Sequence, residues 1–182
     1  MRWLVAAAAW GFAEATLFFV VPDVLLTWLA GFRPRVVWPA AFACLVGALL
    51  GGGLMFLCAQ RDAAGMRNLL DAVPAISREF IAATGAGLQQ DFGAQMLRGG
   101  FTGVPYKIMA VEAGADGQSL AGFLAWSVPA RLSRWILLVL LGRGATVIVR
   151  RCLQRGADRW LWTLWAVGWS IVYAVYFTVM DG

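Results

Sequence analysis

The stretch VVWPAAFACLVGALLGGGLMFLCA fills residues 36–59 and contains no charged side chain. As an α-helix it would be about 36 Å long, and about 20 apolar residues are enough to cross the hydrocarbon core of a bilayer. The composition agrees with a membrane setting, because 61% of the 182 residues are hydrophobic and 14% are charged, against roughly 45–50% and 25% in soluble domains. Residues 36–59 therefore predict a transmembrane helix in a single, all-α membrane domain.

Two further stretches are long enough to span the bilayer. Residues 160–180 carry no charge and have tryptophans at one end and tyrosines nearer the other, as is typical of interfacial aromatic residues. Residues 120–141 are also mostly apolar but include Arg131 and Arg134. Since each arginine costs about 2.5–3.5 kcal/mol at the centre of a membrane helix, we expect both to face protein or water.

Residues 3–32 are apolar except for Glu14 and Asp23, and Pro22 lies between two stretches that are each too short to cross alone. We favour a re-entrant helical hairpin that enters the membrane, breaks near residues 20–23 and returns, because irregular backbone at depth is tolerated where it lines a cavity. Two alternatives stay open. One is a single tilted span with buried acids, and the other is a signal peptide cleaved near Ala15.

The middle of the chain combines a polar segment with a second broken apolar one. Residues 62–98 mix charged residues with Gly, Ala and Gln, and their apolar side chains recur at four-residue spacing. This spacing predicts amphipathic surface helices or a solvated helical connector. Residues 99–117 are too interrupted for a span and predict a second re-entrant hairpin. The expected breakers of the two hairpins are Pro22, Gly100, Gly103 and Pro105.

Arginines set the expected orientation, since short cytoplasmic loops are rich in Arg and Lys. Residues 142–159 hold five arginines and one acid, which predicts a cytoplasmic loop, an external C-terminus and, by threading backwards, a cytoplasmic N-terminus. The two hairpins then enter from opposite faces, each followed by a transmembrane helix. In transporters, inverted repeats of this kind form the substrate site where broken helices meet near the midplane, so we expect the functional site between the hairpins.

Residue types exclude much of enzyme chemistry. The sequence has no His, which removes Ser-His-Asp and Cys-His systems and His-ligated zinc. Its three cysteines, at 44, 58 and 152, lack metal-ligand spacing. We therefore expect no catalytic residue, no metal and no cofactor. The formal charge of +5 is interpreted as an orientation signal, with no nucleic-acid partner.

Charges within apolar segments are the main functional signal, since each must be paired or hydrated. The expected substrate or ion pathway consists of Glu14, Asp23, Lys107, Glu112, Arg131 and Arg134. Arg131 and Arg134 share a helix face because they are three residues apart, so they can present two guanidinium groups to a phosphate or to the first-hairpin acids. The alternative is a buried ion-pair network that only fixes the helices.

One run has a counterpart in a known family. DFGAQMLRGGFTGVPYKIMAVEAG, residues 91–114, resembles the DedA (VTT domain) family of membrane proteins. The hallmark of that family is an amphipathic helix ending in Tyr-Gly, then Arg-Phe, one or two prolines, a basic residue and a closing Ala-Gly. The acidic first hairpin and the glycine-rich helix before Arg61 are also similar to the family. The chain departs from the pattern where Gly100 precedes Phe101, with Arg98 two residues earlier.

The resemblance implies a multi-pass protein of the bacterial inner membrane that moves lipids across the bilayer. Undecaprenyl phosphate or a glycerophospholipid would be the substrate, with proton coupling through the hairpin acids left open. Membrane lipids with anionic phosphate head groups are the expected partners, and a homo-oligomer is also left open. The alternatives are a small proton-coupled cation or drug exporter that uses Glu14, and a non-transporting assembly factor that uses residues 62–98 as a partner surface.

Overall fold

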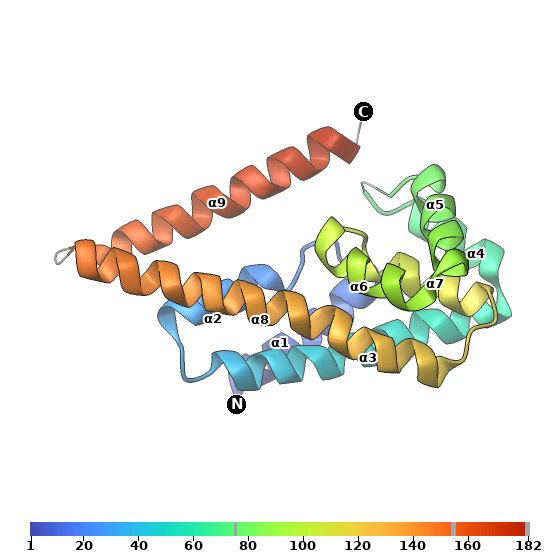
Figure 1. Ribbon diagram of the computed structural model, residues 1–182, viewed down its shortest axis with the longest axis horizontal. Coiled ribbons are helices and arrows are strands. Elements are labelled where there is room, and N and C mark those ends of the chain that lie inside the picture. Colours follow the sequence, from blue (N-terminus) through green and yellow to red (C-terminus); the bar gives the residue numbers. More distant parts are fainter. Residues whose placement is uncertain (75, 154–155, 181–182) are drawn as a thin grey trace.

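The computed structural model describes residues 1–74, 76–153 and 156–180. In these residues the fold is all-helical, as predicted, with nine helices and no strand (Figure 1). The helices are α1 (Arg2–Thr16), α2 (Asp23–Phe32), α3 (Val37–Arg61), α4 (Ala63–Asp71), α5 (Arg78–Gln90), α6 (Phe92–Thr102), α7 (Tyr106–Ala115), α8 (Leu120–Cys152) and α9 (Ala157–Met180).

Three of these helices, α3, α8 and α9, are long and apolar enough to cross a membrane. The helix α8 has 33 residues and is therefore about 50 Å long, which exceeds the hydrocarbon core of about 30 Å. It continues to Cys152, through most of the basic stretch that we expected to be a loop. Arg150 and Arg151 lie in its last turn, where positive charge interacts favourably with the helix dipole. Figure 1 shows this end of α8 extending beyond the hairpins together with the start of α9.

Residues 2–32 form a helical hairpin with two short arms. The arms α1 and α2 have 15 and 10 residues, so each is shorter than the hydrocarbon core. The chain turns back between them, because the ring centroids of Trp3 and Trp28 are 5.2 Å apart and Trp10 Nε1 donates a hydrogen bond to the Val20 carbonyl at 2.9 Å. Pro22 is the N-cap of α2 and marks the end of the break.

The second hairpin consists of α6 and α7. It begins earlier than residue 99, because Asp91 caps α6 by accepting a hydrogen bond from the Ala94 amide at 2.9 Å. The break follows Gly103, whose φ of 86° is in the left-handed region that glycine adopts without strain. Pro105 then forms the N-cap of α7. Gly100 is not a breaker, since it lies within α6.

Close helix packing explains the glycine at position 100. A Cβ atom there would lie 2.6 Å from the carbonyl oxygen of Ala130 in α8, so only glycine lets the two helices approach this closely. The same relation holds between α1 and α3, where an added Cβ at Gly51 would lie 2.7 Å from the Phe12 carbonyl oxygen. Glycine at these contacts therefore allows one hairpin arm to pack closely on each of two long helices, α6 on α8 and α1 on α3.

The two hairpin-plus-helix units pack in an inverted arrangement. The first arm of each hairpin lies on the long helix that follows it, α1 on α3 and α6 on α8. The second arm lies on the long helix of the other unit, α2 on α8 and α7 on α3. Because α3 and α8 run in opposite directions (Figure 1), the hairpins point toward each other and their tips meet in the middle of the molecule.

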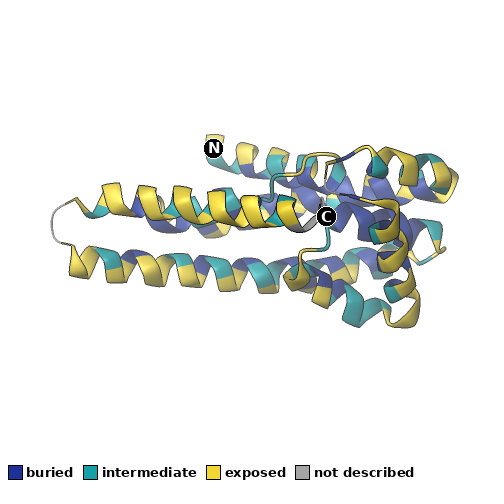
Figure 2. Cartoon of the chain, turned by 90° about the horizontal axis from the view of Figure 1, so that it is seen from above, coloured by how far each residue is buried: buried dark blue, intermediate teal, exposed yellow. Residues whose placement is uncertain are grey.

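Burial is concentrated around the hairpins and the surface helices. Leu70, Ile81, Leu88 and Met96 place the apolar faces of α4, α5 and α6 in the core beside α7. Leu88 and Met96 belong to the four-residue spacing that predicts amphipathic helices, whereas Leu70 and Ile81 lie outside it. In contrast, Figure 2 shows mostly exposed residues along α9. The exposed side chains on the long helices include large apolar ones such as Phe42, Leu140 and Ile171, which is the surface expected to face lipid.

The arrangement predicts the sides on which exposed residues are labelled. With Cys58 and Cys152 replaced by Ala and the buried Cys44 retained, cysteines introduced one at a time at the exposed positions Arg35 and Arg151 should react with a membrane-impermeant maleimide from one side. A cysteine at Glu79, on the surface helix α5, should react only from the other side. Residue 35 precedes α3 and α5 follows it, so a membrane-spanning α3 separates the two positions. Labelling of Arg35→Cys and Glu79→Cys from the same side would contradict a membrane-spanning α3.

A charged cavity between the hairpin tips

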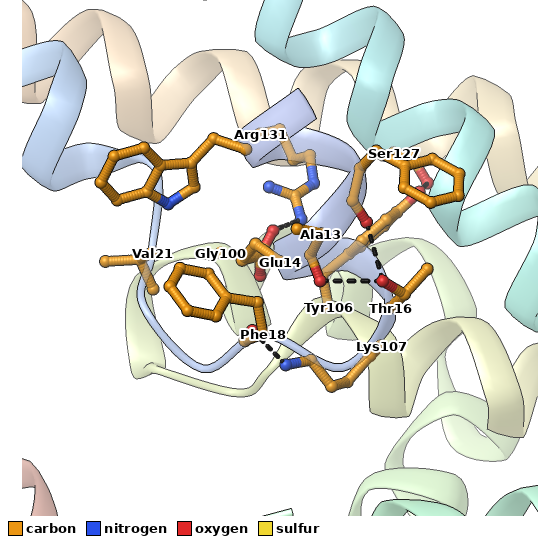
Figure 3. Close-up of polar contacts among 12 residues, drawn as sticks. Ala13, Glu14, Thr16, Phe18, Val21, Gly100, Tyr106, Lys107, Ser127 and Arg131 are labelled. Atoms are coloured by element: carbon orange, nitrogen blue, oxygen red, sulfur yellow. Dashed lines mark hydrogen bonds and ion pairs between the residues drawn. The ribbon is translucent and has the colours of Figure 1, made fainter. Parts of the chain in front are cut away.

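The hairpin tips meet beside a cavity of about 340 Å³. The Nζ atom of Lys107, in the first turn of α7, donates a hydrogen bond to the Phe18 carbonyl at 2.7 Å (Figure 3). This contact joins the second hairpin to the tip of the first. Five of the six predicted pathway residues line the cavity, namely Glu14, Asp23, Lys107, Arg131 and Arg134. Pro22, Gly100, Gly103 and Pro105 also line it.

Arg131 connects one arm of each hairpin to α8. Its guanidinium group forms an ion pair with Glu14 of α1 (Figure 3), and both side chains are more than nine-tenths buried. The guanidinium carbon also lies 4.0 Å from the ring centroid of Tyr106 in α7, a favourable cation–π geometry. The Tyr106 hydroxyl in turn donates a hydrogen bond to Ser127 Oγ at 2.9 Å, so α1, α7 and α8 are joined by one polar network.

Arg134 connects the remaining two arms. It forms an ion pair with Asp23 at the start of α2 and donates a hydrogen bond to the Gly100 carbonyl of α6 at 3.1 Å. The Asp23 side chain is fully buried. The two arginines, which lie on one face of α8 as their spacing predicts, therefore bind all four hairpin arms to the same helix.

Lys107 leaves the cavity with an excess of positive charge. Its lining contains three cations and two carboxylates, and the carboxylates are paired with the arginines. In the part of the chain that the structure describes, Lys107 has no carboxylate within ion-pair distance, and its ammonium group contacts only the Phe18 carbonyl as a hydrogen-bond acceptor. Lys107 is also the only lysine of the sequence. The positive charge of the cavity that has no carboxylate partner among the described residues is therefore the Lys107 amine, which differs chemically from the arginine guanidinium groups.

The last helix, α9, supplies one wall of the cavity through residues that the sequence reasoning missed. Trp169, Val172, Tyr173 and Tyr176 line the cavity. The indole N–H of Trp169 donates to Thr27 Oγ1 at 3.0 Å, and the Tyr173 hydroxyl accepts a hydrogen bond from the Val21 amide at 2.9 Å. The available signal was the four-residue spacing of polar aromatic side chains on one face of α9.

Glu112 lies away from this cavity, in contrast to the prediction. Five residues separate it from Lys107 on α7, which rotates it by about 140° around the helix. Its carboxylate accepts two hydrogen bonds, both 2.7 Å long, from Nε and Nη2 of Arg67 in α4, and these bonds raise the pKa of the Arg67 guanidinium. A Cβ atom at Gly85 in α5 would lie 2.6 Å from this carboxylate. Glu112 therefore holds α7 to the surface helices.

Arg98, which precedes Gly100 in the family-like run, is exposed and does not line the cavity. It lies one turn before the end of α6. The cation that reaches the cavity from the second hairpin is therefore Lys107.

Searches against protein-family models, curated proteins and solved structures find no match to this chain. Among the described residues, no group of three or more His, Cys, Asp or Glu side chains could hold a metal ion.

The buried pair Arg131–Glu14 should show strong energetic coupling. Arg131→Met and Glu14→Gln each leave an uncompensated polar group in the interior, so each should lower the free energy of unfolding in detergent by about 3–5 kcal/mol. The double variant should lose clearly less than the sum of the single losses. Chemical unfolding followed by tryptophan fluorescence measures all three values.

A matched control is the exposed pair Arg150–Asp158, with a distance of 3.1 Å between Arg150 Nη2 and Asp158 Oδ1. Arg150→Met and Asp158→Asn should each cost about 1 kcal/mol or less. Additive losses at Arg131 and Glu14, equal in size to those of this control pair, would contradict the role assigned to the buried pair.

Proposed function

We propose that this protein moves a phosphate-bearing lipid across the bilayer. The observation that carries the proposal is the excess cation Lys107 in a cavity enclosed by two helical hairpins and by long apolar helices. A buried charge of this kind in a membrane domain is costly unless it meets a counterion. An anionic lipid head group supplies that counterion and arrives from the surrounding membrane.

The helix ends around the cavity also favour an anion. The second arms α2 and α7 both begin at the hairpin tips, and a helix N-terminus carries a partial positive charge with free amide groups. In α2 the first turn contains Asp23, whereas the first turn of α7 contains no acid and includes Lys107. The N-terminus of α7 is therefore the part of the cavity where a phosphate would be bound, with Lys107 as its counterion.

Two buried atoms of residues that line the cavity can contribute to head-group binding. Within the described part of the chain, Asp23 Oδ1 and Arg131 Nε have no hydrogen-bond partner. One is an acceptor and the other a donor, and such buried polar groups are normally satisfied by protein, water or ligand. A hydroxyl-bearing head group or a bridging water would satisfy both of them.

A cation exporter is less well supported by this site. A transported cation needs an accessible carboxylate, yet Glu14 and Asp23 already form ion pairs with Arg131 and Arg134. The net charge of the lining is positive, which repels cations. The site therefore favours anion transport over cation transport.

The resemblance of residues 91–114 to the DedA family supports the same proposal. In this proposal both hairpins are re-entrant and enter from opposite faces of a bacterial inner membrane, with a cytoplasmic N-terminus and an external C-terminus. The inverted packing of the two units and the arginines of residues 142–159 support that topology. Undecaprenyl phosphate and glycerophospholipids are the lipid classes to compare.

The proposal predicts that phosphate lipids protect one amine from chemical modification. Because Lys107 is the only lysine, an amine-reactive ester can label only this side chain and the N-terminal amine. Micelles containing undecaprenyl phosphate or phosphatidylglycerol should slow labelling of Lys107 by about tenfold, whereas phosphate-free diacylglycerol should not. Peptide mass spectrometry measures both sites, and the N-terminal amine is the internal reference.

Transport is tested in proteoliposomes with fluorescent phosphatidylglycerol and with undecaprenyl phosphate. Lys107→Gln should abolish movement of both lipids while the protein remains folded, since Lys107 lies outside the two ion pairs. Arg98→Gln removes one positive charge from the same hairpin outside the cavity, so it should transport normally. Equal transport by Lys107→Gln and the unmodified protein, or equal movement of phosphate-free lipids, would contradict the proposal.

A further inference from the structure

The charged and the uncharged residues of the cavity lining come largely from different elements. The charged side chains lie at the hairpin tips and on α8. The helix α9 lines the cavity with uncharged residues, namely Trp169, Val172, Tyr173 and Tyr176. The cavity therefore changes from a site for a head group to a hydrocarbon environment across its width.

The helix α9 has few packing partners among the described residues. The helix α9 packs on α8 and α2, and in the described residues it makes no extensive contact with α6 or α7. Figure 1 shows the C-terminal half of α9 diverging from α8, while Tyr173 and Phe177 keep it in contact with the tip of the first hairpin. On the other side of the cavity, the wall is formed by Val73, Pro74 and Ile76 and by Val104 at the tip of the second hairpin.

We propose that the space between α9 and these residues is a lateral portal that holds the hydrocarbon chain of the phosphate lipid. This inference rests on the proposed function and adds the path of the chain. A volume of about 340 Å³ is at the lower end of the range for small-ligand sites, about 300–1,000 Å³, so the cavity holds a head group but not a whole lipid. The chain must leave between two helices, and this is the side with an apolar lining.

Hydrogen bonds fix the α9 side of the portal without closing it. Trp165 and Trp169 both donate to Thr27 Oγ1, at 3.2 Å and 3.0 Å, and Tyr173 bonds to the Val21 amide. These contacts all reach the first hairpin. The opposite edge of α9, which faces the second hairpin, has no comparable hydrogen bond among the described residues, so the portal can admit a chain without breaking this attachment.

Two valines of α9 provide a matched test. Val172 and Val175 are 53% and 55% exposed, and both lie in the same apolar helix, but only Val172 lines the cavity. A tryptophan at position 172 would occupy the portal, whereas a tryptophan at position 175 would point into lipid, where large aromatic side chains are tolerated. The two variants add the same side chain to the same helix.

The experiment measures transport and head-group binding separately. In phosphatidylcholine vesicles, Val172→Trp should slow movement of fluorescent phosphatidylglycerol and of undecaprenyl phosphate by about tenfold, and Val175→Trp should match the unmodified protein. Both variants should retain protection of Lys107 by glycerol 3-phosphate, a head group without a chain. Equal melting temperatures in detergent confirm that both variants are folded.

The outcomes distinguish the portal from the proposed function. If the unmodified protein moves neither lipid, the proposed function fails. If it moves them and the two valine variants behave alike, the portal is wrong while the proposed function stands. Loss of Lys107 protection in Val172→Trp would place Val172 in the head-group site and would also overturn the portal. Selective slowing of one lipid supports the portal and identifies which lipid chain occupies it.

Discussion

The fold depends on the cost of burying two arginines in an apolar helix. Arg131 and Arg134 lie on one face of α8, and each would be unfavourable by several kcal/mol without a partner. Their partners are distributed so that Glu14 and Asp23 come from the two arms of the first hairpin, while Tyr106 and Gly100 come from the two arms of the second. Satisfying these two side chains therefore brings both hairpins to the same level of α8.

This constraint divides the cations of the cavity into two roles. The arginines are engaged by carboxylates, an aromatic ring and a backbone carbonyl, as suits a planar group with several donors. Among the described residues, the Lys107 ammonium group bonds only to the Phe18 carbonyl, so it is not engaged by a carboxylate. The sequence alone places Arg131, Arg134 and Lys107 in one expected substrate or ion pathway. The structure separates them into two ion-paired arginines that hold the hairpins and one lysine that lines the cavity and has no ion pair with any described residue.

Much of this arrangement follows from local sequence. The remaining features depend on helix phase or on tertiary packing. An uncharged run predicts α3, and the cost of buried charge predicts that Glu14, Asp23 and the arginines converge. The side of α7 that Glu112 faces depends on where that helix begins, and Gly103 and Pro105 only bracket this start. The extension of α8 and the capping of α6 by Asp91 were missed because hydropathy alone does not mark helix ends. The contacts of α9 with Thr27 depend on tertiary packing that no local pattern reveals.

The two hairpin-plus-helix units pack alike, but the first turns of their second arms carry opposite charges, Asp23 in α2 and Lys107 in α7. One side of the cavity is therefore more positive than the other. Each second arm begins at the cavity, so two helix N-termini, both partially positive, face the same space. Asp23 neutralises the N-terminus of α2 and simultaneously pairs with Arg134. The equivalent position near the start of α7 is occupied by Lys107, which adds to the positive potential. In the proposed transport, an anion in the cavity is drawn toward the second hairpin, while Glu14 and Asp23 of the first hairpin pair with the arginines that hold both hairpins in place.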